Sequence, residues 1–151
     1  MAINPFILPP SERLSHWKTF RRSLPSLSDT QQLEQVAAYF AQAPIITIAC
    51  NLDTPNTWPT IWEMVSAGEW CRNSTAIGIY ATLHLAGWAA ARLDLRHVID
   101  HENSVMVLVV LVDGNTLLNY DWGVTKLRPA GMRTFRRYGW TGHSFTLGGR
   151  E

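Results

Sequence analysis

The stretch WPTIWEMVSAGEWCRNSTAIGIYATLHLAG, residues 58–87, decides the expected fold. Pro59 suits the first turn of a short helix, and Gly68 ends that helix. A second helix begins after Cys71 and closes at about Gly87, and its residues are apolar on most faces. Because a helix that is apolar all round is buried, this helix is expected at the centre of the domain.

Two more helices are expected before this stretch. The first spans about 11–22, and the second spans about 29–42, where Ser28 and Gln31 form a capping-box pattern. The segment 1–10 reads MAINPFILPP, with three prolines and no periodicity. It is therefore predicted to be an extended N-terminal arm.

The pattern changes to period two after the central helix. Alternating residues at 92–99 predict a strand with one wet side, the apolar run 105–112 predicts a buried strand, and 116–122 predicts a third. The pair Asp113-Gly114 indicates a hairpin between the last two. Helices followed by an antiparallel meander indicate a single α+β domain at 11–125, with the central helix on the apolar face of the sheet.

The segment 126–151 is rich in glycine and has little periodicity, so it is expected to be an irregular C-terminal arm. It is also basic, with no acid before Glu151 and with six cations: Lys126, Arg128, Arg133, Arg136, Arg137 and Arg150. A contact with nucleic acid or an acidic partner is one interpretation of this arm, and a solvated arm that packs through arginine is the other.

The composition indicates a protein with a partly covered surface and argues against general nucleic-acid binding and against a membrane span. Charged residues make up 17% of the chain and there are seven tryptophans, whereas a typical domain has about 25% charged residues. A partner is therefore expected to cover part of the surface. The net charge of +1 predicts no general attraction to nucleic acid, and the longest apolar run has eight residues, too few to cross a membrane.

Two cysteines make no disulfide framework, and the N-terminus lacks the pattern of a secretory signal, so the chain is expected in the cytoplasm of the cell that makes it. Cys71 has a second interpretation, because the positive end of a helix dipole stabilises a thiolate and can make a cysteine a nucleophile. The cysteines and histidines show no convincing metal-ligand spacing, and no cofactor motif is found.

Four motifs stand out in the region 58–122: Gly68-Glu69-Trp70-Cys71, Leu85-Ala86-Gly87, Val112-Asp113-Gly114 and Leu117-Leu118-Asn119-Tyr120-Asp121. With these motifs the region resembles the transglutaminase-like and papain-like superfamily. The resemblance implies a cysteine nucleophile at the start of a helix, then a histidine and an aspartate on successive strands. Carried to this chain, these roles fall to Cys71, to His97 or His101 as the base, and to Asp121.

Strand register tests that assignment. If Asp113-Gly114 is a two-residue turn, Asp121 lies opposite Met106, and His97 faces Met106 from the other side. Two strand spacings, about 9.6 Å, then separate His97 from Asp121. The simplest register therefore assembles no Cys-His-Asp triad, and the chain is expected not to be an enzyme.

Tryptophans and the basic arm supply candidate contact residues. An aromatic and proline cluster precedes the central helix, and it is interpreted either as an interface anchor or as a lid of the core. The proposed interface comprises Trp58, Trp62, Trp70, Arg133, Arg136, Arg137, Tyr138 and Trp140.

Segments TPNTWPTIWEM, CRNSTAIGIYATL and LLNYDWG also resemble a group of uncharacterised tailed-phage proteins. This resemblance implies a bacteriophage context: a non-enzymatic structural subunit of the virion neck, tail or baseplate, formed in the host cytoplasm and bound to copies of itself and other virion proteins. One alternative is a small cysteine hydrolase or acyltransferase. Another is a small-molecule or host-factor binding protein, with a pocket lined by Trp62, Trp70 and Arg128.

Overall fold

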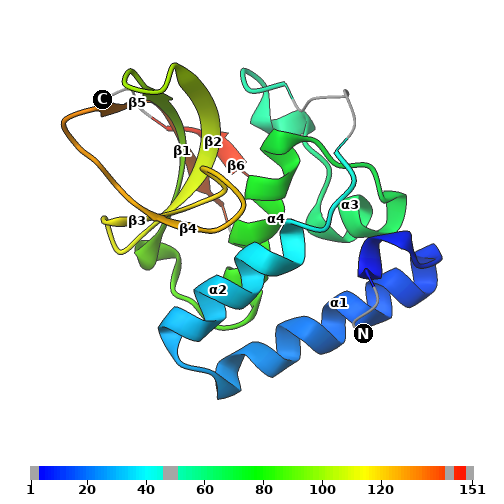
Figure 1. The fold of residues 1–151 in the computed structure, drawn as a ribbon. Helices are drawn as coiled ribbons and strands as arrows, with labels where there is room; N and C mark the ends of the chain where they lie inside the picture. Colours follow the sequence, from blue (N-terminus) through cyan, green and yellow to red (C-terminus); the bar gives the residue numbers. More distant parts are fainter. Residues whose placement is uncertain (1–3, 46–50, 142–144, 149–151) are drawn as a thin grey trace.

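The computed structural model describes residues 4–45, 51–141 and 145–148, and it shows a layer of helices packed on a layer of strands (Figure 1). The helices are α1 (Pro10–Ser23), α2 (Asp29–Phe40), α3 (Ile61–Ala67) and α4 (Arg72–Leu85). Helix α4 lies between the sheet and the other helices (Figure 1). The expectation of a central buried helix is confirmed. Short 3-10 turns occupy Pro5–Ile7, Leu24–Ser26, Pro55–Thr57 and Ala90–Arg92.

The six strands form one antiparallel sheet in the order β4-β3-β2-β1-β5-β6. Their bounds are β1 Leu93–Asp100, β2 Val105–Val112, β3 Thr116–Leu118, β4 Val124–Lys126, β5 Met132–Trp140 and β6 Phe145–Leu147. The α+β class is confirmed, and the expected three-strand meander is its β1-β2-β3 part.

Local sequence signals start and stop the helices where expected. Ser28 and Gln31 form the capping box of α2, and Thr60 and Glu63 form that of α3. Gly68 ends α3 with a left-handed φ of 71°, a conformation that glycine adopts without steric cost. Each of these signals joins residues no more than four apart, so the chain around them decides the result.

The C-terminal segment differs from the expected irregular arm, because β5 and β6 extend the sheet. A bulge opposite the His97–Val98 step adds one residue to β5, so the even-numbered residues of β5 point to one face before the bulge and to the opposite face after it. Met132 packs on the outer face, whereas Tyr138 packs on the face toward α4. The bulge therefore hides the period-two pattern by which a strand is recognised in a sequence.

The N-terminal segment also differs from the expected extended arm in the part that the structure describes. Residues Pro5–Ile7 form a 3-10 turn capped by the Asn4 side chain. The Phe6 ring is buried and lies 5.4 Å from the Tyr39 and Trp70 ring centroids. This segment is thus part of the core.

A buried carboxylate ties the outer face of the sheet to the loop before β5. Asp100 is 0% exposed, and it accepts hydrogen bonds from the Tyr120 hydroxyl, the Asn103 side chain and Arg128. The bonds from Tyr120, from Asn103 and then from Arg128 hold the pKa of Asp100 well below its usual range.

This network predicts an acid-sensitive contribution to stability. Because the folded-state pKa of Asp100 lies below the unfolded value of about 3.9, the ionised carboxylate stabilises the fold above that value, and the stabilisation is lost as the pH falls through the folded-state pKa. The difference in urea midpoint between wild type and Asp100→Asn is expected to shrink from about pH 7 to about pH 3. Asp121→Asn, at an exposed loop position, is the control, and a constant Asp100 difference across this range would contradict the assignment.

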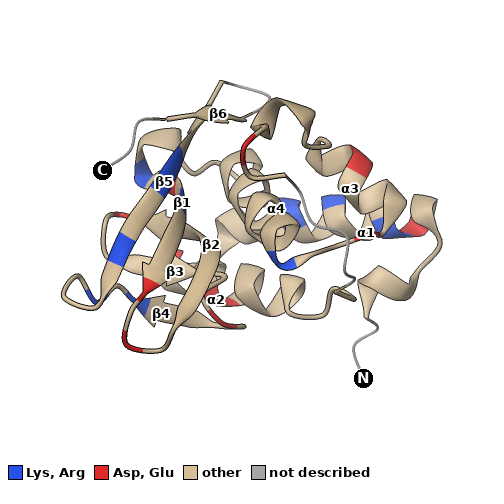
Figure 2. Ribbon diagram, turned by 90° about the horizontal axis from the view of Figure 1, so that it is seen from above, with Lys and Arg blue, Asp and Glu red and all other residues tan. Residues whose placement is uncertain are grey.

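No helix within the described residues is both long and apolar enough to cross a membrane. Cations gather along β5, where Figure 2 shows blue segments. Arg136 pairs with Asp53 and Arg137 pairs with Asp94. These ion pairs partly neutralise the basic strand, and a nucleic-acid contact there stays a prediction.

Candidate functional site

Cys71 occupies the N-cap of α4, as its sequence position indicated. Its Sγ accepts the Ser74 backbone N–H at 3.3 Å, and its own N–H donates to the Ser74 hydroxyl at 2.7 Å. The residue is only 6% exposed. The cysteine therefore performs the task of a capping side chain, in the position where a helix terminus would also stabilise a thiolate.

Asn119 links the first turn of α4 to the sheet. Its Nδ2 donates to the carbonyls of Arg72 and Leu108, both at 2.8 Å. Its Oδ1 accepts from Arg72 Nη1 at 3.0 Å and from the Thr75 hydroxyl at 2.7 Å. The side chain is 3% exposed, and its two donors and two acceptor sites are all used. Asn119 thus has no hydrogen-bonding capacity left to orient a histidine.

The register on the two sides of β2 differs from the one expected. Val112 pairs with Thr116 because the turn has three residues, two of which, Asp113 and Gly114, have positive φ. His97 pairs with Leu108, so the predicted position opposite Met106 is wrong by two residues. The strand β3 ends at Leu118, before Asp121.

His97 lies in an apolar and cationic environment. Its ring packs edge-on against Phe135, with the centroids 5.7 Å apart. Its Nδ1 is buried and has no hydrogen-bond partner among the described residues. Burial, and secondly the cationic Arg136 beside it, lower the pKa of His97. The imidazole is therefore held neutral without the carboxylate that a triad would supply.

The remaining candidates of the triad lie apart from His97. His101 is exposed in the turn after β1, where its backbone N–H donates to Gly131. Asp121 is exposed, accepts the Gly123 N–H at 2.8 Å, and acts electrostatically on Arg72. The structure thus brings Asp121 to the Cys71 end of α4 and leaves His97 against Phe135 and Arg136.

Arg72 holds the segment that carries Asn119 and Asp121. Its guanidinium donates to the backbone oxygens of Asn119 and Tyr120 and stacks over Trp122, 4.3 Å from the ring centroid. Burial lowers the pKa of Arg72, and the Asp121 carboxylate opposes this change. The start of α4 is thus closed by a structural network of an arginine and an asparagine.

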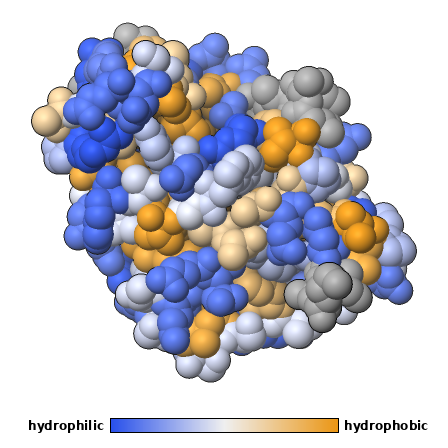
Figure 3. Space-filling view, viewed as in Figure 1, coloured by the Kyte–Doolittle hydropathy of each residue, from blue (hydrophilic) through white to orange (hydrophobic). Residues whose placement is uncertain are grey.

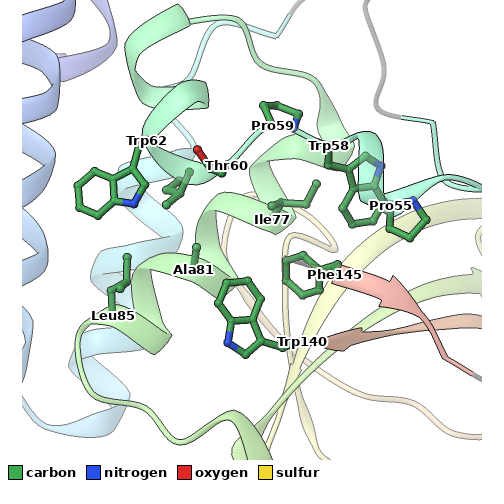
Figure 4. Close-up of a pocket in the computed structure, with 11 residues that line it drawn as sticks. Pro55, Trp58, Pro59, Thr60, Trp62, Ile77, Ala81, Leu85, Trp140 and Phe145 are labelled. Atoms are coloured by element: carbon green, nitrogen blue, oxygen red, sulfur yellow. The ribbon is translucent and has the colours of Figure 1, made fainter. Parts of the chain in front are cut away.

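An apolar pocket of about 220 Å³ lies beside α4, between α3, the Pro55–Thr57 turn and the β5–β6 hairpin (Figure 4). It is lined by Pro55, Trp58, Pro59, Thr60, Ile61, Trp62, Ile77, Ala81, Leu85, Trp140 and Phe145. Other apolar patches on the face shown in Figure 3 are separate and interrupted by hydrophilic residues.

The proposed interface residues separate into three groups in the structure. Trp58, Trp62 and Trp140 line the pocket, with Trp62 39% exposed. Trp70 and Tyr138 belong to the buried core and form no surface. The arginines of the set lie on β5, where Arg133 is exposed, Arg136 donates to the Leu52 carbonyl and Arg137 pairs with Asp94.

The pocket differs from the one expected for a binding protein. Trp62 contributes to it, but Trp70 packs in the core and Arg128 binds Asp100 on the other side of the sheet. The contributions of Leu85 and Phe145 were missed, because the former belongs to a helix that reads as uniformly buried and the latter to a segment that reads as irregular. No three His, Cys, Asp or Glu side chains are grouped as a metal site in the described parts of the chain.

Comparison with known proteins finds similarity at the level of the fold. No protein-family model and no curated protein matches the chain. Calcium-bound LapG of Legionella pneumophila is similar in structure, with a TM-score of 0.72 and 17% identity over 95% of this chain and 85% of LapG. A second LapG structure has a TM-score of 0.70 and 18% identity, covering 92% and 81% of the two chains. The fold is therefore transglutaminase-like.

Proposed function

We propose that the chain is a ligand-binding domain on a transglutaminase-like fold and that it binds through the pocket beside α4. The observation that carries this proposal is the apolar pocket lined by Trp58, Trp62 and Trp140. Ligand sites are concave and lined mainly by hydrophobic and aromatic side chains. The small volume suits one ring or a short alkyl chain.

The environment of the triad candidates supports binding over catalysis. Asn119 uses its hydrogen bonds on the start of α4, and His97 has a cation rather than a carboxylate beside it. A general base must be oriented by a third group to activate a cysteine. Cys71 accordingly acts as the helix cap in this proposal.

A second candidate function is cysteine-dependent hydrolysis or acyl transfer, favoured by the fold shared with LapG and by the position of Cys71 at a helix N-terminus. In this reading Cys71 is the nucleophile, His97 or His101 removes its proton, and Asp121 orients the base. A neutral imidazole at pH 7 is suited to accept a proton.

Alkylation of Cys71 separates the two functions. In a Cys50→Ser protein, which retains Cys71 as its one cysteine, iodoacetamide is expected to react at about pH 6 no faster than with free cysteine, because the thiol is buried and serves as a cap. His97→Gln is expected to leave the rate unchanged. A rate well above that of free cysteine, lost on His97→Gln, would overturn the proposal in favour of the enzyme.

Assembly as a phage virion subunit stays a prediction. The two segments expected as terminal arms, which such a subunit would use to bind its neighbours, instead pack in the core through Phe6 and the β5–β6 hairpin. Deleting 1–10 or 126–151 would therefore unfold the domain rather than remove a contact. Detection of the intact protein in purified particles is the direct measurement.

A further inference from the structure

The pocket beside α4 has an apolar lining, and two cations of α1 lie next to one of its lining residues, Trp62. Trp62 is the shared wall, since it lines the pocket and also extends from α3 toward α1 (Figure 4). On α1, Lys18 Nζ lies 5.6 Å and Arg21 Cζ lies 5.1 Å from the centroid of the Trp62 ring. A molecule that fills the pocket and passes Trp62 therefore meets positive charge.

These cations have no carboxylate partner among the described residues. Ion pairs occupy Arg92, Arg96, Arg128, Arg136 and Arg137, whereas none is formed by Lys18 or Arg21.

Glu63, the acid next to Trp62, forms no ion pair with either cation in the described part of the chain. Its carboxylate accepts the Thr60 backbone N–H and caps α3, and these hydrogen bonds lower the pKa of Glu63 and keep it ionised at that position. Burial, and secondly the cationic Arg22, lower the pKa of Arg21. An anion at this side would relieve that repulsion.

We infer that the pocket binds a small amphipathic carboxylate, whose ring or short alkyl chain enters between Trp58, Trp140 and Phe145 and whose carboxylate pairs with Arg21 and Lys18. This inference rests on the proposed binding function and names its ligand class. Burial of each methylene in such a site favours binding, and a guanidinium donates to a carboxylate in a bidentate geometry. The carboxylate is ionised at neutral pH.

Calorimetry with three probes of equal chain length tests the inference: octanoate, octanol and octyltrimethylammonium. Octanoate is expected to bind about ten-fold more tightly than either of the others, because only octanoate pairs with the cations. Equal or tighter binding of octanol or of the ammonium probe would overturn the ligand class while leaving a binding pocket. Absence of binding by all three would overturn the inference and the proposed function together.

Substitutions test whether Arg21 and Lys18 bind the carboxylate while the pocket binds the alkyl chain. Arg21→Gln with Lys18→Gln is expected to weaken octanoate about ten-fold and leave octanol unchanged. Arg133→Gln is the control, since it removes an exposed arginine on β5 away from the pocket. Unchanged octanoate binding in the Arg21 and Lys18 variant would overturn the inference, because the cations would then merely pack on Trp62.

Leu85→Asp provides a test that spares the core. Leu85 lines the pocket and is 45% exposed, so the fold is expected to tolerate the change. A carboxylate there is expected to abolish octanoate binding by repulsion and desolvation. Retained octanoate affinity in a folded Leu85→Asp protein, checked by circular dichroism, would show that the ligand lies elsewhere and overturn the inference.

Discussion

Replacing Trp70 with alanine is expected to lower the free energy of unfolding by about 3–5 kcal/mol, the range for a large aromatic removed from a core. Trp70 is 1% exposed, and its ring lies 5.4 Å from the Phe6 and Phe40 centroids. A Cβ on Gly78 would come within 3.0 Å of the Trp70 ring, so α4 packs directly on it. Alanine would leave a cavity between the Pro5–Ile7 turn, α2 and α4, so all three elements would have to move to close it.

Urea unfolding followed by circular dichroism measures this loss. Trp70→Phe is expected to cost less, because it keeps an aromatic ring and because Trp70 Nε1 has no hydrogen-bond partner to lose among the described residues. Trp122→Ala is the exposed control, with an expected loss within about 1 kcal/mol. A loss below about 1 kcal/mol for Trp70→Ala would instead favour the interpretation of Trp70 as an interface anchor.

Replacing Asn119 with alanine is expected to cost about 2–4 kcal/mol, from lost hydrogen bonds and from backbone strain. The variant leaves the carbonyls of Arg72 and Leu108 without the Asn119 donor in a buried site. Asn119 also has a φ of 72°, in the left-handed region that asparagine adopts more readily than alanine. The lost hydrogen bonds and the backbone strain therefore both contribute to the effect of this one substitution.

Asn119→Gly separates these two costs. Glycine adopts the left-handed conformation freely but makes no side-chain hydrogen bond, so its loss contains the hydrogen bonds and the added entropy of the unfolded chain but no backbone strain. Asn115→Ala is the matched control at an exposed turn position, with an expected loss within about 0.5 kcal/mol. Equal stability of the wild type and Asn119→Ala in urea would contradict the network that closes the start of α4.

The sequence groups Trp70 with Trp58 and Trp62 in one aromatic and proline cluster, interpreted either as an interface anchor or as a lid of the core. In the structure Trp58 and Trp62 line a pocket, whereas Trp70 is buried. Sequence spacing does not separate the three tryptophans, whereas the parallel bridge between Ile45 and Trp70 and the packing of Phe6 place Trp70 inside. A segment near the N-terminus therefore decided the burial of a residue far along the chain.

Asn119 shows how turn length controls the site. A two-residue turn would have placed Asp121 in the strand opposite Met106, but the turn has three residues and pairs Val112 with Thr116. Each added turn residue shifts the facing partner by one, and nothing in the Asp113-Gly114 pair specifies whether a third residue joins the turn. The asparagine, rather than the aspartate, consequently bonds the start of α4.

The α+β class, the ends of α2 and α3 and the burial of α4 follow from the sequence alone, because caps, glycine stops and apolar periodicity act within a few residues of the chain. Only the tertiary structure decided that β5 and β6 complete the sheet and that aromatic side chains from α3, α4 and the C-terminal hairpin enclose a pocket. The extra strands are hidden in the sequence because a bulge breaks the period-two pattern of β5. The pocket is hidden because segments far apart in the chain form it, and a local pattern cannot predict which distant segments meet.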